Sequence, residues 1–283
     1  NNDHITLFCT HLIDPPKSIF AILQEFNANA KGTGCCCRPG IRVNLQMKCG
    51  GKCMNVTKLD GIGACVFDAY GTLFDVNAAA QHCAADLGDK WLPLAELWRG
   101  RQLQYTWLRS LMGEYADFWQ VTGEALDFAM DALDLEDAQL RERLMELYLQ
   151  LDAYPEVGDV LRRLQDGGMK TAILSNGSPK MLDAAVANAG IGGALDAVIS
   201  ADQIKVYKTA PGVYQMAVDQ LGVAPGAISF QSSNAWDAHA ASNFGFRVVW
   251  VNRFGQPRER LPGNPDVMLD SLESLPSIVG VEG

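Results

Sequence analysis

An aspartate that directly follows a short apolar run is the residue best placed to do chemistry. Ala64–Phe67 is apolar and predicts a buried strand, and Asp68 comes next, followed by Tyr70 and the turn Gly71-Thr72. Open α/β sheets bind their ligands at the carboxyl ends of strands, which is where this pattern puts Asp68. An aromatic residue two positions later suits an apolar pocket for a small organic substrate.

A second polar cluster, Ser175-Asn176-Gly177-Ser178-Pro179, follows another apolar run. Ser178 before Pro179 is typical of a helix N-cap and first turn. The free N–H groups and the positive dipole end of such a terminus make a seat for a carboxylate, and the Ser175 hydroxyl is placed to help hold it. The alternative is that these residues only cap the helix.

Two charged residues follow later apolar runs. Lys208 comes after Val206-Tyr207, and a lysine beside Asp68 would keep that carboxylate ionised and offset its repulsion with an acidic substrate. Asp237 ends the run Ser232-Ser233-Asn234-Ala235-Trp236-Asp237. Taken alone, a lysine is more often simply solvated.

Strand-length apolar runs alternate with helical periods from Gly61 onward. The strand candidates are Ala64–Phe67, Met169–Leu174, Ala197–Ser200, Ala227–Phe230 and Arg247–Val251. Helical stretches such as Lys180–Asn188 and Val213–Leu221 separate the later ones. This alternation predicts an α/β fold with a Rossmann-like parallel sheet, built from residues 61–79 and 153–283.

Residues 80–152 show only the helical period, so we expect a helical cap domain inserted after the first strand. The spacing places four groups on shared faces: Leu94, Leu97 and Trp98; Trp107, Leu108, Leu111 and Met112; Leu126, Met130 and Leu133; Leu140, Leu144 and Leu147.

The composition excludes several classes of partner. The chain has 283 residues, 48% of them hydrophobic, and a formal net charge of −10. Nucleic acid and anionic membranes need a basic surface, so neither is expected as a partner. The sequence has no apolar run of about 18 residues, the length of a membrane span, and no secretory leader pattern. These features predict a cytoplasmic protein.

Residues 1–60 differ in composition from the rest of the chain. They hold most of the 8 cysteines and show little periodicity, so we expect a disordered or non-native N-terminal extension. The alternative is a metal or disulfide site, although three adjacent cysteines do not converge easily on one tetrahedral ion. Its residues would be Cys35, Cys36, Cys37, Cys49 and Cys53.

Together the motifs resemble those of the haloacid dehalogenase superfamily over roughly residues 61–280. The first is Asp68-Ala69-Tyr70-Gly71-Thr72, in which superfamily phosphatases have a second aspartate at the Tyr70 position. Leu97-Trp98-Arg99 begins a stretch similar to a cap helix of the family. The run that ends at Asp237 is a specific match to the (S)-2-haloacid dehalogenase branch.

The resemblance implies a hydrolase that converts short (S)-2-haloalkanoic acids, its small-molecule substrates, into (R)-2-hydroxy acids. Asp68 would attack the carbon that bears the halogen, on the face opposite the halide, and form an ester with it. Water would then cleave the ester at the Asp68 carbonyl. Only the first step touches the substrate carbon, so its configuration inverts.

The resemblance also implies roles for the polar residues around Asp68. Thr72 would hold the Asp68 loop by hydrogen bonding. Asp237 would activate the water, and Lys208 is the alternative activating group. The residues that would position Asp237 are Ser232, Asn234 and Tyr214.

A departing halide needs N–H donors while its charge develops. Arg99 of the cap and Asn176 are the implied donors, with Trp236 at the edge of the same cradle, and Ser175 would hold the substrate carboxylate. The implied apolar pocket is lined by Tyr70, Leu103, Phe118 and Trp236. Leu103 and Phe118 are explained equally well as ordinary core residues.

No cofactor and no metal are expected. Tyr70 and Ser233 stand where the metal-dependent phosphatases have acidic residues, and a hard cation prefers several charged oxygen ligands. Two alternatives stay open: a Mg²⁺-dependent small-molecule phosphatase of the same superfamily, and a non-catalytic binding protein with this fold. The resemblance further implies a homodimer formed through cap helices. His239 is expected to be solvated.

Overall fold

In a computed structural model the chain divides into two units, residues 1–53 and 54–283. The structure describes residues 58–76 and 84–281, all in the second unit. The predicted N-terminal extension therefore lies outside the described residues up to position 57, as does the alternative cysteine site. Leu59 is buried, and its N–H donates to the Ile278 carbonyl oxygen at 2.8 Å, so this residue packs with the core.

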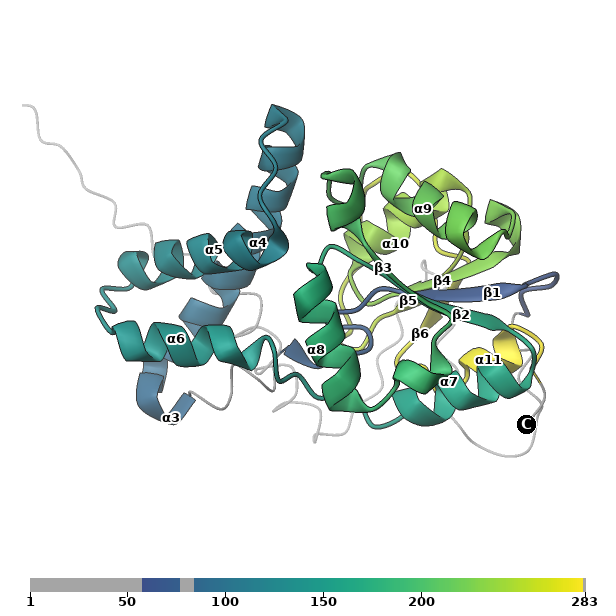
Figure 1. The fold of residues 1–283 in the computed structure, drawn as a ribbon, viewed down its shortest axis with the longest axis horizontal. Helices are drawn as coiled ribbons and strands as arrows, with labels where there is room; N and C mark the ends of the chain where they lie inside the picture. Colours follow the sequence, from purple (N-terminus) through teal and green to yellow (C-terminus); the bar gives the residue numbers. More distant parts are fainter. Residues whose placement is uncertain (1–57, 77–83, 282–283) are drawn as a thin grey trace, which may run out of the picture. The chain divides into compact units, whose positions relative to one another are not determined.

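Within the described residues, one sheet of six parallel strands runs in the order β3-β2-β1-β4-β5-β6 (Figure 1). The strands are β1 (Ala64–Phe67), β2 (Lys170–Ser175), β3 (Ala197–Ser200), β4 (Ile228–Ser232), β5 (Arg247–Val251) and β6 (Val267–Leu269). This confirms the predicted α/β fold with a parallel sheet. Three predicted strands have the observed bounds, β2 and β4 are displaced by one or two residues, and the short edge strand β6 was not predicted.

Helices cover both faces of the sheet, because a parallel sheet is stable only when both its faces are buried. Helices α9 and α10 pack on one face, and α7, α8 and α11 pack on the other (Figure 1). They span α7 (Val157–Asp166), α8 (Pro179–Ala189), α9 (Pro211–Leu221), α10 (Ala235–Phe244) and α11 (Leu275–Ile278), with short 3-10 turns at η2 (Gly192–Ala194), η3 (Ala201–Ile204) and η4 (Pro225–Ala227).

The central strand β1 is fully buried, which explains its unbroken apolar sequence. Cys65 within it behaves as a small apolar side chain, as expected, and burial raises the pKa of its thiol to about 12.

A helical layer follows β1 in the chain and lies within the predicted 80–152 range. It comprises α3 (Ala84–Leu87), η1 (Gly88–Lys90), α4 (Trp91–Met112), α5 (Phe118–Ala132) and α6 (Ala138–Leu147). Its two connections to the core run side by side. Phe74 and Ala153 form an antiparallel bridge, and the Tyr154 N–H donates to the Leu73 carbonyl at 2.9 Å. Backbone contacts therefore join the two connections to each other.

The apolar face predicted at the C-terminal end of α4 lies on the surface of the single chain. Leu111 is 85% exposed and Met112 64% exposed, and Trp107 and Leu108 are also exposed. The helical period identified a real face of the helix, but periodicity cannot say what the face packs against.

His239 on α10 is buried, so the expectation that it is solvated was wrong. Its Nδ1 lies 3.2 Å from the Leu261 carbonyl oxygen, because the segment after β5 folds back over α10. Gly263 makes this approach possible. It has a φ of +84°, and a Cβ at this position would stand 2.3 Å from the His239 carbonyl oxygen.

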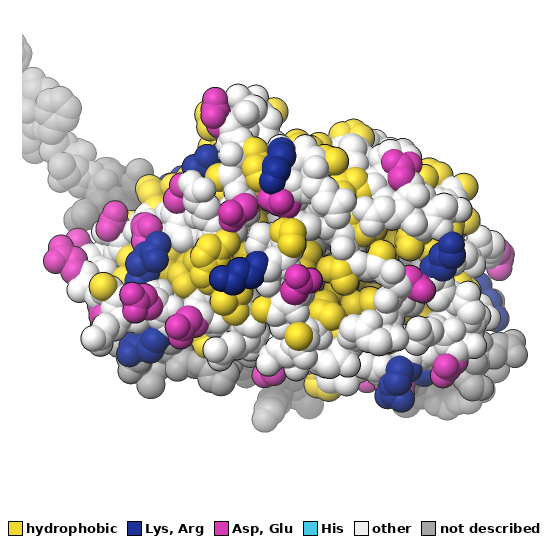
Figure 2. All heavy atoms as spheres, in the orientation of Figure 1, with side chains coloured by type: hydrophobic (Ala, Val, Ile, Leu, Met, Phe, Trp, Pro, Cys, Tyr) yellow, Lys and Arg dark blue, Asp and Glu magenta, His cyan; other side chains and the backbone are white. Residues whose placement is uncertain are grey.

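No helix among the described residues is long and apolar enough to cross a membrane. On the face shown in Figure 2, lysine and arginine side chains are scattered among acidic ones, with apolar side chains gathered between them.

Candidate active site

Asp68 stands at the carboxyl end of β1 with three side chains aimed at its carboxylate. The Lys208 ammonium donates to Oδ1 at 2.9 Å, while Thr72 Oγ1 and Asn234 Nδ2 donate to Oδ2 at 3.1 and 2.8 Å. The Asp68 N–H is fixed by the Gln231 carbonyl at 2.9 Å. Both oxygens are therefore held in one orientation, in a side chain that is almost completely buried.

Lys208 joins the carboxylates of Asp68 and Asp237. Its ammonium is 2.8 Å from Asp237 Oδ2, and its side chain is only 1% exposed. Burial alone would lower the pKa of Lys208, but the charges of Asp237 and Asp68 outweigh burial and raise it above the ordinary value. The lysine stays charged.

Asp237 is completely buried in the first turn of α10. Burial raises the pKa of Asp237; the Lys208 charge opposes the rise and the Asp68 charge adds to it. Tyr214 on α9 donates its hydroxyl proton to Asp237 Oδ1 at 2.7 Å. A buried carboxylate with a raised pKa, held by two donors, has the properties of a general base.

The loops after β1 and β4 are joined by hydroxyl groups. Thr72 Oγ1 accepts the Ser233 N–H at 2.8 Å while donating to Asp68. Ser232 Oγ accepts the Asn234 N–H at 3.2 Å, which fixes the residue that caps α10 by position. These hydrogen bonds are consistent with the supporting roles predicted for Thr72 and Ser232.

Ser175 and Asn176 end β2 just before α8. Ser175 Oγ accepts the Gly177 N–H at 3.1 Å, which leaves its own proton free to donate. Asn176 Oδ1 accepts the Lys208 N–H at 2.9 Å, so the orientation of the amide is fixed. Ser178 occupies the N-cap position with Pro179 following, as predicted, but its side chain makes no capping bond.

The cap reaches the core through Arg99 on α4. Arg99 Nη2 donates to Asn234 Oδ1 at 3.3 Å, and Asn234 in turn donates to Asp68. Asn234 thus links this cap arginine to Asp68, which lies 31 positions earlier in the sequence.

Tyr70 and Phe118 form one aromatic wall. Their rings are stacked with centroids 5.9 Å apart, and both residues are buried. Gly177 packs directly against this wall, since a Cβ there would stand 2.8 Å from the Tyr70 ring.

Two predicted pocket residues are placed less clearly. Trp236 packs edge-on against Trp107 of α4, with centroids 5.5 Å apart, so it contacts the cap. Leu103 is partly exposed, and its backbone carbonyl accepts the Thr106 hydroxyl at 2.7 Å.

Comparison with known proteins places this arrangement in a family. Residues 62–245 match the model of the haloacid dehalogenase-like hydrolases. The chain is also 49% identical, over 222 residues, to (S)-2-haloacid dehalogenase 1 of Pseudomonas sp. (strain CBS-3). The alignment covers 78% of this chain and 98% of that protein. This chain belongs to the (S)-2-haloacid dehalogenase branch of that family.

Solved structures of dehalogenases have the same fold. A dehalogenase crystallised as an intermediate complex is 45% identical, has a TM-score of 0.77 and covers 79% of this chain and 99% of its own. The L-2-haloacid dehalogenase from Xanthobacter autotrophicus with chloropropionic acid covalently bound is 39% identical, has a TM-score of 0.72 and covers 77% of this chain and 98% of its own.

The described residues of this dehalogenase-family chain do not fit the divalent cation of superfamily phosphatases. Over 58–76 and 84–281, no cluster of three or more His, Cys, Asp or Glu side chains is placed to hold a metal. The Lys208 ammonium lies between the carboxylates of Asp68 and Asp237. It therefore pairs with the same oxygens that a divalent cation would need as ligands.

Several residues around the dehalogenase site were not predicted from the sequence. Gln102 accepts from Arg99 Nη1 at 2.7 Å. Burial raises the pKa of the nearby Tyr148, and Arg99 and Gln102 oppose that rise. Arg253, two residues after β5, donates to the Thr72 carbonyl at 2.9 Å. A polar residue one turn from Arg99 was a usable signal for Gln102. Nothing in the local sequence of Arg253 points to Thr72.

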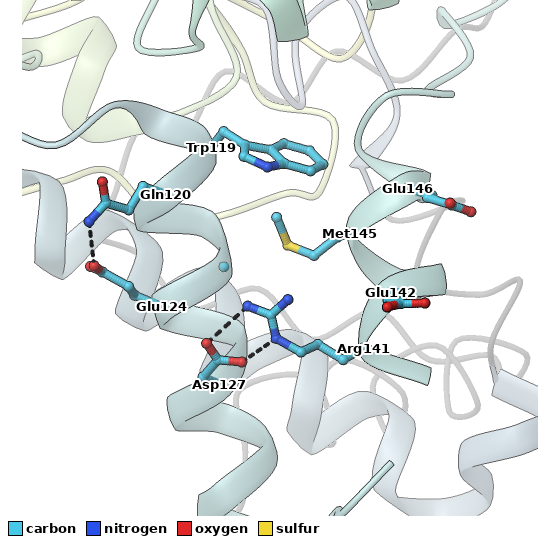
Figure 3. Close-up of a pocket in the computed structure, with 9 residues that line it drawn as sticks. Trp119, Gln120, Glu124, Asp127, Arg141, Glu142, Met145 and Glu146 are labelled. Atoms are coloured by element: carbon cyan, nitrogen blue, oxygen red, sulfur yellow. Dashed lines mark hydrogen bonds and ion pairs between the residues drawn. The ribbon is translucent and has the colours of Figure 1, made fainter. Parts of the chain in front are cut away.

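The surface of this dehalogenase-family chain has a further groove on the cap, of about 380 Å³, between α5 and α6 (Figure 3). It is lined by Trp119, Gln120, Gly123, Glu124, Asp127, Arg141, Glu142, Met145 and Glu146. Its polar groups are partly paired: Arg141 Nη2 donates to Asp127 at 3.0 Å, and Gln120 donates to Glu124 at 2.8 Å. No predicted site residue lines it.

Proposed function

We propose that this enzyme hydrolyses short (S)-2-haloalkanoic acids to (R)-2-hydroxy acids through an ester of Asp68. The observation that carries the proposal is the convergence of Lys208, Asn234 and Thr72 on the Asp68 carboxylate, with Arg99 of the cap beside it. The covalent chloropropionic acid complex of the Xanthobacter autotrophicus relative supports the same chemistry.

In the first step a carboxylate oxygen of Asp68 attacks the substrate carbon that bears the halogen. The new C–O bond forms as the carbon–halogen bond breaks, and the halide leaves with the bonding electrons. The Ser175 proton and the N-terminus of α8 hold the substrate carboxylate. Lys208 keeps Asp68 ionised despite that nearby negative charge.

The halide departs on the side opposite Asp68, where N–H donors stabilise its charge. Arg99 and Asn176 supply them, and Trp236 lies at the edge of the same space. Tyr70, Leu103 and Phe118 enclose the substituent on the substrate carbon. Stabilising charge only as it develops is what lowers the barrier.

In the second step water attacks the carbonyl carbon of the Asp68 ester. Asp237 accepts a proton from that water, the acyl C–O bond breaks, and the 2-hydroxy acid leaves with its oxygen and a proton. Ser232, Asn234 and Tyr214 position this end of the site. A groove of about 410 Å³ is lined in part by Tyr214, the residue whose hydroxyl donates to Asp237. Lys208 is the alternative activating group.

The first test is halide release from (S)- and (R)-2-chloropropionate with excess EDTA, for the unaltered enzyme and Asp68→Asn. We expect release from the (S) form alone, independent of EDTA and lost in the variant. A single turnover in ¹⁸O-water should leave the label on Asp68 and not in the product. Mg²⁺-dependent hydrolysis of p-nitrophenyl phosphate without halide release would overturn the proposal in favour of a phosphatase.

We infer that the enzyme is a homodimer whose contact includes the end of α4. Trp107, Leu108, Leu111 and Met112 form an exposed apolar face of the kind that is usually covered in solution. Leu111→Glu should convert a dimer to a monomer in sedimentation equilibrium, whereas Lys58→Glu, on an exposed residue of the core, should not.

We also propose a cytoplasmic location, for which the acidic composition and the mixed surface of Figure 2 are the support. Fractionation of the cells that produce the protein tests this, and recovery with the membranes or outside the cells would overturn it.

A further inference from the structure

A buried chain of polar side chains crosses the cap beneath Arg99. Gln102 on α4 and Thr122 on α5 are both completely buried. An amide or hydroxyl group in such a place is costly unless its hydrogen bonds are satisfied. Gln102 Nε2 donates to Thr122 Oγ1 at 2.7 Å, and Gln102 Oε1 accepts from Arg99 Nη1 at 2.7 Å.

The direction of this chain is fixed at its far end. Thr122 Oγ1 donates to the Phe118 carbonyl at 2.6 Å, and a carbonyl can only accept. The Thr122 oxygen therefore has only lone pairs left for Gln102, so the NH₂ group of Gln102 must face it. The Gln102 carbonyl then faces Arg99, which can only donate. The reversed amide would set two donors against each other at Arg99 and two acceptors against each other at Thr122.

The chain continues from Arg99 into the core. Arg99 Nη2 donates to Asn234 Oδ1 at 3.3 Å, and Asn234 Nδ2 donates to Asp68 Oδ2 at 2.8 Å. One guanidinium nitrogen is thus held by the cap interior while the other points at the partner of the nucleophile. An arginine side chain has several rotatable bonds, so an anchor at one nitrogen limits where the other donors lie.

We propose that Gln102 and Thr122 are positioning residues for dehalogenation, which hold the Arg99 donors where the halide departs. The inference rests on the proposed function and deepens it. Donors placed before the reaction stabilise the developing charge without reorganisation, so their misplacement slows bond cleavage more than it weakens substrate binding. A poorer leaving group depends on them more strongly.

The decisive variant is Thr122→Val, which keeps the shape of the side chain and removes the acceptor for Gln102. We expect kcat for (S)-2-chloropropionate to fall about tenfold, the effect of one hydrogen bond, with KM changed by less than about twofold. The fall should be smaller for (S)-2-bromopropionate. Thr122→Ser restores the hydroxyl and should restore both rates.

The matched control is Thr106→Val. Thr106 is equally buried on α4, and within residues 58–76 and 84–281 its hydroxyl bonds only to the backbone carbonyl of Leu103, at 2.7 Å. The same substitution there should leave the bromide-to-chloride ratio of kcat unchanged. Gln102→Met is the second variant: it leaves the bond between Thr122 and Phe118 intact, puts an apolar chain of similar length in an apolar interior, and should reproduce the altered ratio.

The two proposals fail in different ways. If the unaltered enzyme releases no halide, the proposed function is wrong. If it does, but Thr122→Val and Gln102→Met match Thr106→Val in the bromide-to-chloride ratio, the inference is overturned, even where their unfolding temperatures fall. Altered ratios in both variants, with the ratio restored by Thr122→Ser, would support it.

Discussion

The ammonium of Lys208 lies 2.8 Å from a carboxylate oxygen of Asp237, and both side chains are buried away from solvent. Because Asp68 also contacts this ammonium, one positive charge serves two buried negative ones. Such a cluster is stable only while it is complete, since removal of one partner leaves an uncompensated buried charge.

Lys208→Met should therefore abolish halide release and destabilise the fold by about 3 kcal/mol at neutral pH. The loss of stability should be smaller at acidic pH. Burial raises the pKa of Asp237 and the Lys208 charge opposes that rise, so without the lysine the folded-state pKa of this carboxyl is higher still. The folded variant therefore takes up a proton more readily than the unfolded chain as the pH falls. Urea unfolding at pH 5 and pH 7.5 measures this. Lys205→Met, which removes an exposed lysine, is the control; an equal loss there would contradict the argument.

Tyr214→Phe should move the acidic limb of the pH profile for kcat to higher pH. The Tyr214 hydroxyl bond lowers the pKa of Asp237 and so opposes the rise caused by burial and Asp68. Its removal leaves the carboxyl protonated up to a higher pH, and only the ionised form accepts a proton from water. Tyr207→Phe removes a hydroxyl bonded to the Ala116 carbonyl instead and should leave the limb in place. An unshifted limb in Tyr214→Phe would point to Lys208 as the activating group.

Much of this site was predictable because its residues follow strands directly in the sequence. Asp68, Ser175 and the run that ends at Asp237 each come at the end of an apolar segment, and parallel strands bring such ends to one edge of the sheet. Apolar periodicity likewise predicted the cap helices, since the period depends only on local geometry.

What the sequence did not yield depends on contacts between distant segments. The bond from Gln102 to Thr122 joins two helices, and no spacing encodes it. His239 was judged by its own helix, yet its burial depends on a segment more than twenty residues later. β6 is too short, and too exposed at its middle residue, to show a strand pattern.

Arg253 is expected to support the Asp68 loop from behind. It donates to the Thr72 carbonyl, pairs with Glu156 at 2.7 Å, and lies 3.7 Å over the Tyr154 ring, so it touches both connections between core and cap. Burial opposes ionisation of Glu156, but hydrogen bonds from backbone N–H groups and Arg253 outweigh it and lower the pKa of that carboxyl.

Arg253→Met should cost about 3 kcal/mol of unfolding free energy, and a double-mutant cycle with Glu156→Gln should show strong coupling. Arg247→Met breaks a more exposed pair with Asp266 and should cost about 1 kcal/mol or less. If the two arginine variants lose equal stability, Arg253 has no special part in joining cap and core.

Gly177→Ala tests the packing of the aromatic wall. A Cβ at Gly177 would stand 2.8 Å from the Tyr70 ring and 3.1 Å from Leu182. Tyr70 cannot retreat, because its other contacts include Phe118 and Phe74. The added methyl group should therefore cost about 1–3 kcal/mol of stability.

The same substitution should raise KM for 2-haloacids, because the methyl group added against the Tyr70 ring would narrow the proposed substrate pocket. Gly158→Ala is the control: it lies within α7 with open space around it, and alanine favours a helix over glycine by up to about 1 kcal/mol. Thermal unfolding and halide-release kinetics on both variants decide the point. An unchanged KM in a destabilised Gly177→Ala enzyme would remove Tyr70 from the substrate pocket and leave it as a structural residue of the core.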